Sequence, residues 1–178
     1  MAITFVVEDG TGKSDSTSYS DLAYAEQYVL DYVTSPTDWN GATDDEKKQA
    51  LNIASRYLDS KYGAVLQGYK KLSTQSLQWP RTYVVDRDGN SIDYDSIPDK
   101  WKQATVEVAV YSIGGNDLFA NLDSGGALKA EKIKIDVITI EKQWSGSNEQ
   151  STVASKIDGL VDEYLKSGSA VTAEVRRG

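Results

Sequence analysis

The segment over residues 99–113 carries apolar side chains around most of a helical circumference, and no other feature constrains the fold as strongly. Trp101, Ala104 and Val108 recur at the three- and four-residue spacing that is typical of an α-helix. The positions that widen this apolar surface are Thr105, Val106, Ala109, Val110, Tyr111 and Ile113. A helix that is apolar over so much of its surface is buried in its own chain or packs against a second molecule.

Local signals mark where this helix and the others begin and end. Ser96 is a candidate cap before Pro98, which the first turn of a helix tolerates, and Gly114 ends the segment. Further helices are predicted from about residue 20 to Pro36, from Thr43 to about Leu58, and over 157–165.

Two of these helices carry capping signals. Ser18 with Asp21 resembles a cap pair, and Thr43 with Glu46 has the spacing of a capping box. The acidic run over 44–46 favours the positive end of the helix dipole. We therefore interpret it as helix initiation rather than as a carboxylate cluster for a metal.

The predicted β content is small. Residues 82–94 indicate a hairpin because Asp88-Gly89 suits a turn with positive φ. The acidic residues there also invite a calcium interpretation, but the glycine and glutamate of an EF-hand loop are not at the required positions. Alternation predicts a strand over 132–141.

Two Gly/Ser-rich segments contain few apolar side chains that could form part of a core. Residues 9–18 follow a short predicted strand over 3–8, and we expect them to be a flexible loop; the P-loop spacing around Gly10 and Gly12 is missing. Residues 144–152 are expected to be a second, solvated loop, and both could become ordered on a neighbouring molecule.

These elements predict a mainly α fold with a small β component, an α+β protein with a helical core of about four helices. A chain of 178 residues is expected to form one domain over 1–166, with an extended N-terminal segment over 1–18. An extended tail over 167–178 is expected to follow it.

The chain contains no histidine and no cysteine, which removes most catalytic and metal-binding chemistry. Catalytic triads that use histidine, thiol nucleophiles, disulfides and histidine- or cysteine-ligated metals are excluded. Paired carboxylates remain, but nearly every acid lies at a helix start, a turn or a polar strand face. We therefore expect no enzymatic activity, no metal and no cofactor.

The charge balance argues against simple affinity for nucleic acid. The 19 basic and 27 acidic residues give a net charge of −8, and the first 50 residues carry 10 acidic and 3 basic residues, a net −7. Nucleic-acid binders usually present a basic face. One local exception combines Lys70 and Lys71 with Trp79 and Arg81, a mixture found in single-strand binders. Aromatic residues at such positions are more typical of a core or a subunit contact.

No targeting signal is recognised in the sequence. A basic segment followed by an apolar block is missing from the amino terminus, and no stretch reaches the ~18 apolar residues of a membrane span. We therefore expect no membrane partner.

Several motifs together resemble a known family. They are Ser18–Ala25, Ala50–Asp59, Gln75–Arg81, Ile97–Pro98, Gln103–Ala109, Lys132–Glu141 and Val161–Leu165. In these the chain resembles tailed-phage proteins labelled DnaT-like single-stranded-DNA-binding, which are similar to head–tail adaptor (connector) proteins. The Leu-Gln-Trp-Pro-Arg run is the most specific part, and the resemblance covers most of residues 1–165.

The resemblance implies a structural protein of the virion, made in the host cytoplasm and located at the head–tail junction. Such adaptors form a ring, typically twelvefold (dodecameric), through which double-stranded DNA passes. The implied partners are further copies of the chain, the portal protein, tail or nozzle proteins and, transiently, the passing DNA. The alternative is a single-stranded-DNA-binding protein of phage replication.

Candidate contact residues lie in two places. Trp79 and Arg81 are residue types that often anchor interfaces, although Trp79 is equally compatible with a core position. The alternating tail could add a strand to a neighbouring subunit. Its candidate contact residues are Val171, Val175, Arg176 and Arg177.

Overall fold

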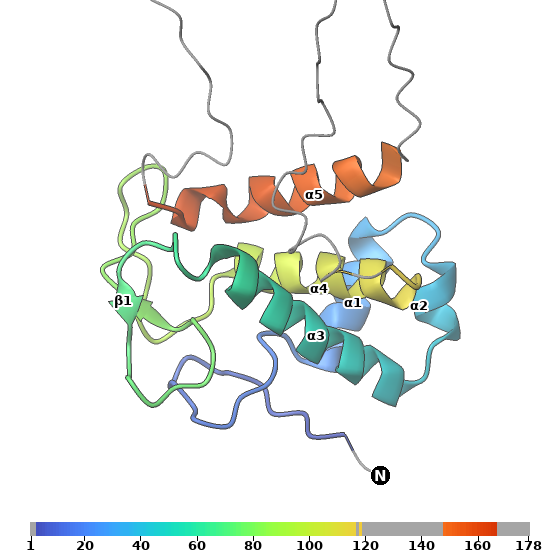
Figure 1. Ribbon diagram of the computed structural model, residues 1–178, viewed down its shortest axis with the longest axis horizontal. Helices are drawn as coiled ribbons and strands as arrows, with labels where there is room; N and C mark the ends of the chain where they lie inside the picture. The colour runs from blue at the N-terminus through green and yellow to red at the C-terminus, as the bar shows by residue number, and fades with distance from the viewer. Residues whose placement is uncertain (1–2, 117, 119–147, 167–178) are drawn as a thin grey trace, which may run out of the picture.

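The helix predicted over 99–113 lies at the centre of the structure. The computed structural model describes residues 3–116, 118 and 148–166. Within them α4 (Asp99–Ile113) contacts α1 (Leu22–Tyr32), α2 (Thr37–Gly41), α3 (Asp44–Tyr62) and α5 (Asn148–Val161). Figure 1 shows α4 between α5 on one side and α1 with the N-terminal segment on the other. The chain itself therefore buries this helix, without a second molecule.

The predicted fold class is confirmed, because the described residues are mainly helical with a small β component. The 3₁₀ turn η1 (Asp162–Tyr164) follows α5, and β1 (Tyr69–Lys70) pairs antiparallel with β2 (Arg81–Thr82). The short α2 adds to the four helices expected, since five residues are too few to show a helical period. No helix in this part of the chain is long and apolar enough to cross a membrane.

The capping box of α3 is confirmed, whereas the cap predicted for α1 is wrong. Thr43 Oγ1 accepts from Glu46 N at 3.3 Å, and the Glu46 carboxylate accepts from Thr43 N at 2.7 Å. At α1 the cap is Asp21, whose carboxylate accepts from Tyr24 N at 2.8 Å. Ser18 is buried instead, with its hydroxyl turned to a neighbouring carbonyl.

The start of α4 also differs from the prediction. Pro98 is the N-cap residue rather than part of the first turn, and Ser96 makes no cap. The Ser96 hydroxyl donates to the carbonyl of Asp93 at 3.0 Å, so it closes the preceding turn. The end of α4 before Gly114 is as predicted.

Trp101 of α4 is the centre of an aromatic cluster drawn from distant parts of the chain. Its ring centroid lies 5.8 Å from that of Trp79, 5.9 Å from Tyr19, 6.3 Å from Tyr62 and 6.4 Å from Tyr164. Each buried ring removes ~150–250 Å² from water, worth roughly 4–6 kcal/mol. Among the described residues the indole N–H groups of Trp79 and Trp101 have no hydrogen-bond partner. The gain from burying each ring exceeds the roughly 1–3 kcal/mol that such an unpaired group costs.

A buried carboxylate joins three helices within this core. Glu107 of α4 is only 7% exposed. Its carboxylate accepts a hydrogen bond from the Tyr28 hydroxyl of α1 at 2.7 Å and pairs with Lys156 Nζ of α5 at 2.5 Å. Because a buried charge is costly unless it is paired, these contacts fix α1 and α5 against α4.

The N-terminal segment is ordered around the carboxylate of Glu8, which is 2% exposed. This carboxylate accepts from the backbone N–H groups of Gly10, Gly12 and Lys13 at 2.8–3.1 Å and from the Ser16 hydroxyl at 3.0 Å. Successive N–H groups aimed at one anion form a nest. The expectation of a flexible loop over 9–18 is therefore wrong, because the desolvated carboxylate gathers the backbone around itself.

The same nest has two further consequences. The N–H groups of Gly10 and Gly12 already face a carboxylate, so they are not presented to a phosphate. The strand predicted over 3–8 is reduced to one parallel bridge between Val7 and Ser18. Its backbone hydrogen bonds go to the end of its own loop rather than to a sheet.

The hairpin predicted over 82–94 forms as a turn with a single antiparallel bridge, between Val85 and Ser91. Asp86 Oδ1 accepts from Asn90 N at 2.8 Å, and Gly89 adopts a φ of 85°. Asp86 thus builds the turn, as the hairpin interpretation requires. The two-stranded sheet lies elsewhere, because β2 pairs with β1.

The remaining predictions concern the C-terminal third. The strand over 132–141 and the tail over 167–178 lie outside the described residues, and the division into one domain and a tail stays a prediction. Residues 148–152, expected to be part of a loop, begin α5. The helix predicted over 157–165 is confirmed as the end of α5 together with η1.

We expect Glu8→Ala to lower the free energy of unfolding by at least about 3 kcal/mol, because it leaves three backbone N–H groups and a hydroxyl without their acceptor. Urea unfolding followed by circular dichroism measures this. Asp15→Ala, an exposed acid of the same loop, is the matched control and should change little. Equal effects of the two substitutions would contradict the role given to Glu8.

Candidate interaction surface

The described surface carries a small set of large apolar side chains that are exposed to solvent. They are Leu30, Tyr32, Tyr69, Leu72, Tyr83, Val85 and Tyr94. Two lie at the end of α1, and five lie between residues 69 and 94, around the two-stranded sheet. Exposed apolar side chains that touch one another indicate contact with another molecule, and Tyr69 and Tyr83 are such a pair.

Tyr69 and Tyr83 form the most exposed pair, which we call the tyrosine edge. They are 72% and 85% exposed, and their ring centroids lie 6.5 Å apart in an edge-to-face arrangement. The pair exists because β1 and β2 are antiparallel, with Tyr69 opposite Thr82. Tyr83 adopts a φ of 59°, which is an outlier for a bulky residue.

Buried Arg81 holds the backbone beneath the tyrosine edge. Its guanidinium donates to the carbonyls of Gln67 at 2.7 Å, Gly68 at 2.9 Å and Gln78 at 3.2 Å. Gly68 is required in this arrangement, since a Cβ there would meet the Thr82 carbonyl at 1.9 Å. The edge is therefore presented by a tightly held turn.

The structure places the predicted contact residues differently. Trp79 is fully buried and Arg81 is 5% exposed, so neither side chain offers a surface to a partner. This burial agrees with the core position left open for Trp79, and Arg81 is a structural clamp. The predicted contact residues of the tail lie outside the described residues: Val171, Val175, Arg176 and Arg177.

A buried hydrogen-bond group fixes the loop that carries Trp79. Asp59 of α3 accepts from the Tyr19 hydroxyl and, at 3.1 Å, from Gln78 N. The Tyr19 oxygen in turn accepts from Gln78 N at 2.8 Å. Burial raises the pKa of Asp59 to about 6 and raises the pKa of Tyr19 well above its ordinary value.

Most basic side chains of the described residues are already paired with acids. Nine lysine or arginine side chains form ion pairs. Near the tyrosine edge, Lys71 pairs with Asp95 and Arg87 pairs with Asp162. Lys70 Nζ lies 3.4 Å from the Gln75 carbonyl. A phosphate would therefore have to displace a carboxylate from most of these cations.

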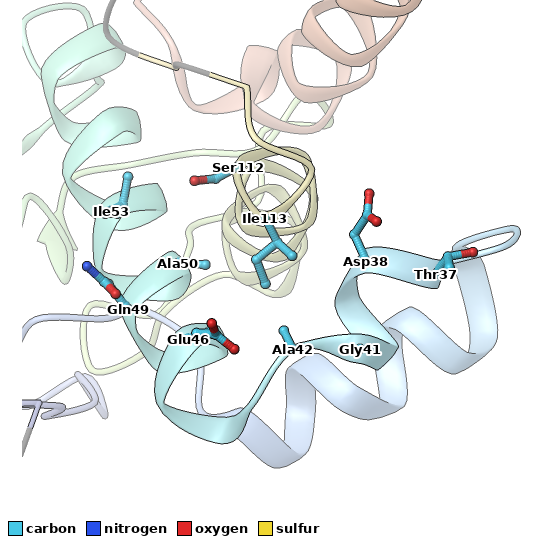
Figure 2. A pocket seen from close by; sticks show the side chains of 10 residues that line it. All are labelled: Thr37, Asp38, Gly41, Ala42, Glu46, Gln49, Ala50, Ile53, Ser112 and Ile113. Atoms are coloured by element: carbon cyan, nitrogen blue, oxygen red, sulfur yellow. The ribbon is translucent and has the colours of Figure 1, made fainter.

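The part of the chain that the structure describes includes two hollows of about 540 Å³ each. The first lies between α2, α3 and the end of α4, with Ile53 and Ile113 among its apolar walls and Asp38 near its rim (Figure 2). Its other carboxylate, Glu46, belongs to the capping box of α3. No group of histidine, cysteine or acidic residues in the described part of the chain is arranged to hold a metal.

The second hollow, which we call the α1–α2 groove, has mainly apolar walls. Its lining residues are Ala23, Glu26, Gln27, Val29, Leu30, Val33, Pro36 and Asn40. Leu30 is 77% exposed although it lines the groove. In Figure 1 α2 lies at the right end of the molecule, whereas β1 lies at the left end.

The tyrosine edge was not predicted from the sequence. Its two members are fourteen residues apart, and only the pairing of β1 with β2 brings them together. The available signal was Gly68 before a tyrosine, because a glycine at a positive φ often accompanies a tight approach of two strands.

The described residues thus form a mainly helical α+β protein with an exposed pair of tyrosines and a mainly apolar groove. The chain belongs to the family described as "Putative DnaT-like ssDNA binding protein", whose family model matches residues 3–178. The family description agrees with the alternative considered from the sequence, binding of single-stranded DNA, better than with a head–tail adaptor. No curated protein and no solved structure matches the chain.

The raised pKa of Asp59 predicts a pH-dependent stability. Because the pKa is about 6 in the folded chain and ~3.9 in the unfolded chain, folding favours the protonated form. The stabilisation of the folded state by Asp59 is therefore fully present below pH ~4. As the pH rises to about 6, this group lowers the free energy of unfolding by up to about 3 kcal/mol. We expect Asp59→Asn to remove this slope from the pH dependence of urea unfolding.

The measured quantity is the slope of the free energy of unfolding against pH between pH 4 and 7. A substitution that changes the stability equally at every pH leaves this slope unaffected. Asp88→Asn replaces an exposed acid and should leave the slope of the unmodified chain in place. A slope that survives Asp59→Asn would show that other groups carry the pH dependence.

Proposed function

We propose that this chain is a structural protein of a tailed-phage particle, a head–tail adaptor without enzymatic activity. Its copies form a ring between the portal and the tail proteins, and DNA passes through that ring. The proposal draws on the resemblance of the Gln75–Arg81 run and its neighbouring motifs to such adaptors. The finished protein is located in the virion.

The observation that carries this proposal is the presence of two different exposed apolar features at opposite ends of the described fold. In Figure 1 β1, which carries Tyr69, lies at one end of the fold, and α2, which helps to line the groove, lies at the other end. A subunit of a ring needs two such surfaces, because a head-to-tail contact joins two different patches.

The electrostatics are compatible with a channel for DNA. The net charge is −8, and nine basic side chains of the described residues are paired with acids. Free cations that hold phosphates would slow the passage of DNA, whereas an acidic wall repels it. The charge therefore favours a protein that lets DNA pass over one that binds it tightly.

Binding of single-stranded DNA is the second candidate, and the family description favours it. The tyrosine edge is the feature that would serve it, since bases stack on exposed aromatic rings for about 1–3 kcal/mol each. Lys70 follows Tyr69 in β1, but successive side chains of a strand point to opposite faces and its Nζ lies 3.4 Å from the Gln75 carbonyl. The paired state of Lys71 and Arg87 argues against this candidate.

Mixing the chain with the portal protein of the same phage tests the first candidate. We expect electron microscopy to show an added ring on the portal, and mass spectrometry to find the chain in purified virions. Portal particles without an added ring, together with absence of the chain from virions, would refute the adaptor function.

An oligonucleotide titration tests the second candidate. We expect fluorescence anisotropy to show no binding of a single strand at about 1 µM protein and physiological salt. Salt-dependent binding that Tyr83→Asn weakens by tenfold or more, and Tyr94→Asn does not, would establish DNA binding at the tyrosine edge instead. Asparagine suits the positive φ of Tyr83, and Tyr94 is a matched exposed tyrosine.

A further inference from the structure

We propose that the C-terminal segment over residues 170–177 lies over the tyrosine edge of its own chain and covers it. Its two valines contact the exposed rings, and Arg176 and Arg177 pair with the acidic turn that follows the edge. This inference goes beyond the adaptor function and does not depend on a ring. It gives the tyrosine edge an occupant in the free protein, so another molecule that binds the edge has to displace the segment first.

The point at which this segment is attached to the described fold lies beside the tyrosine edge. Leu165 forms an antiparallel bridge with Leu66, and Lys166 N donates to the Val65 carbonyl at 2.8 Å. Tyr69 of β1 follows Leu66 by only three residues. In Figure 1 the red end of α5 and β1 lie at the same end of the fold. The segment is therefore attached next to the strand that carries one member of the edge.

Gln67 connects this attachment point to the part of the chain that carries Tyr83. Its side-chain N–H groups donate to the carbonyls of Glu163 at 2.8 Å and Leu165 at 3.2 Å. The oxygen of the same side chain accepts from Val85 N at 3.2 Å. Val85 is 40% exposed and lies two residues after Tyr83. One side chain thus links the start of the C-terminal segment to the surface that we propose it covers.

The length of the segment is sufficient for this contact. Ten residues separate Lys166 from Arg176, and an extended chain of that length spans up to ~34 Å. The run over residues 167–169, Ser-Gly-Ser, has the composition of a turn and permits a reversal of direction. A tethered segment has an effective concentration in the millimolar range, so a dissociation constant of about 0.1 mM keeps it bound for roughly nine-tenths of the time.

The apolar side chains of the segment suit the two exposed rings. Val171, Ala173 and Val175 alternate with polar residues, which is the spacing of one face of a strand. Tyr69 and Tyr83 are 72% and 85% exposed, and their rings are in contact. Aromatic and β-branched side chains are favourable neighbours on adjacent strands. Covering the rings with valines therefore removes the largest exposed aromatic surface of the described fold from water.

The charges of the segment complement those of the turn that follows the edge. Residues 86–95 carry four aspartates and one arginine, a net charge of 1 − 4 = −3. The arginine is paired with Asp162, whereas among the described residues Asp86 and Asp88 form no ion pair. Residues 170–177 carry two arginines and one glutamate, a net charge of 2 − 1 = +1. Arginine also packs favourably on tyrosine rings.

Nitration of the tyrosines in the unmodified chain tests the inference, because a covered ring reacts only while the segment is displaced. Tyr32 of α1 is 65% exposed and serves as the internal reference. We expect mass spectrometry to show that Tyr69 and Tyr83 are nitrated about tenfold more slowly than Tyr32, at every protein concentration. Arg176→Glu together with Arg177→Glu should raise both rates to at least that of Tyr32, because the new charges repel the acidic turn.

Two further variants decide whether the contact is the proposed one. Asp88→Arg, added to the two arginine substitutions, should restore the slow nitration of Tyr83. Lys48→Glu with Arg56→Glu makes the same change of charge on α3 and should leave the nitration slow. Nitration of Tyr83 as fast as that of Tyr32 in the unmodified chain would overturn the inference, and so would protection that survives the arginine substitutions. Protection only at high protein concentration would assign the edge to a second copy instead.

Disulfide trapping gives a second measurement, because the chain contains no cysteine and both anchors can stay in place. Ala173→Cys is combined with Ser91→Cys, since Ser91 is exposed and bridges to Val85. Ser60→Cys is the matched partner, exposed on α3 near the same attachment point. We expect the disulfide to Ser91→Cys to form within one chain and about tenfold faster than the disulfide to Ser60→Cys. Equal rates, or linkage between two chains, would reject the contact.

Discussion

The packing of aromatic rings around Trp101 is the interaction on which the rest of the structure depends. The rings of Tyr19, Tyr62, Trp79 and Tyr164 lie 5.8–6.4 Å from it and come from four separate segments. Each of those segments is short or irregular apart from α3, and none has an apolar surface large enough to fold alone. The cluster therefore converts loops into fixed parts of the fold, and it does so because α4 is apolar nearly all round.

Three buried charged side chains then determine how the segments are oriented, and each of the three is hydrogen-bonded or paired within the chain. Glu107 joins α1 and α5 to α4, Glu8 orders the N-terminal segment, and Arg81 holds the turn before Tyr83. In these contacts the charged groups bind backbone groups or opposite charges of the same chain. Among the described residues, most basic side chains are then paired with acids, and the exposed aromatic rings are the most distinctive feature of the surface.

The functional proposals depend on which aromatic residues stay outside this core. Trp79 and Tyr83 are four residues apart in the chain, yet one is fully buried and the other is 85% exposed. The exposed ring is held in an unfavourable backbone conformation by its surroundings, which stabilise the turn more than the strain costs. The adaptor function proposed above uses this projecting ring and the α1–α2 groove as its two contact surfaces.

The sequence by itself determined that α4 must be covered over most of its surface, and it determined the capping box of α3, the mainly helical class and the acidic character of the chain, because these follow from local spacing and composition. Whether α4 is covered by its own chain or by a second molecule was decided by the structure. It also excluded chemistry that needs histidine or cysteine. Only the tertiary structure decided that residues 9–18 are ordered, that Trp79 and Arg81 are internal, and that Tyr69 and Tyr83 form an edge. Those outcomes depend on contacts between residues that are distant in the chain, such as Asp59 with Gln78 or Trp101 with Tyr19, and on the register of β1 with β2. A local pattern carries no information about which distant partner a side chain meets.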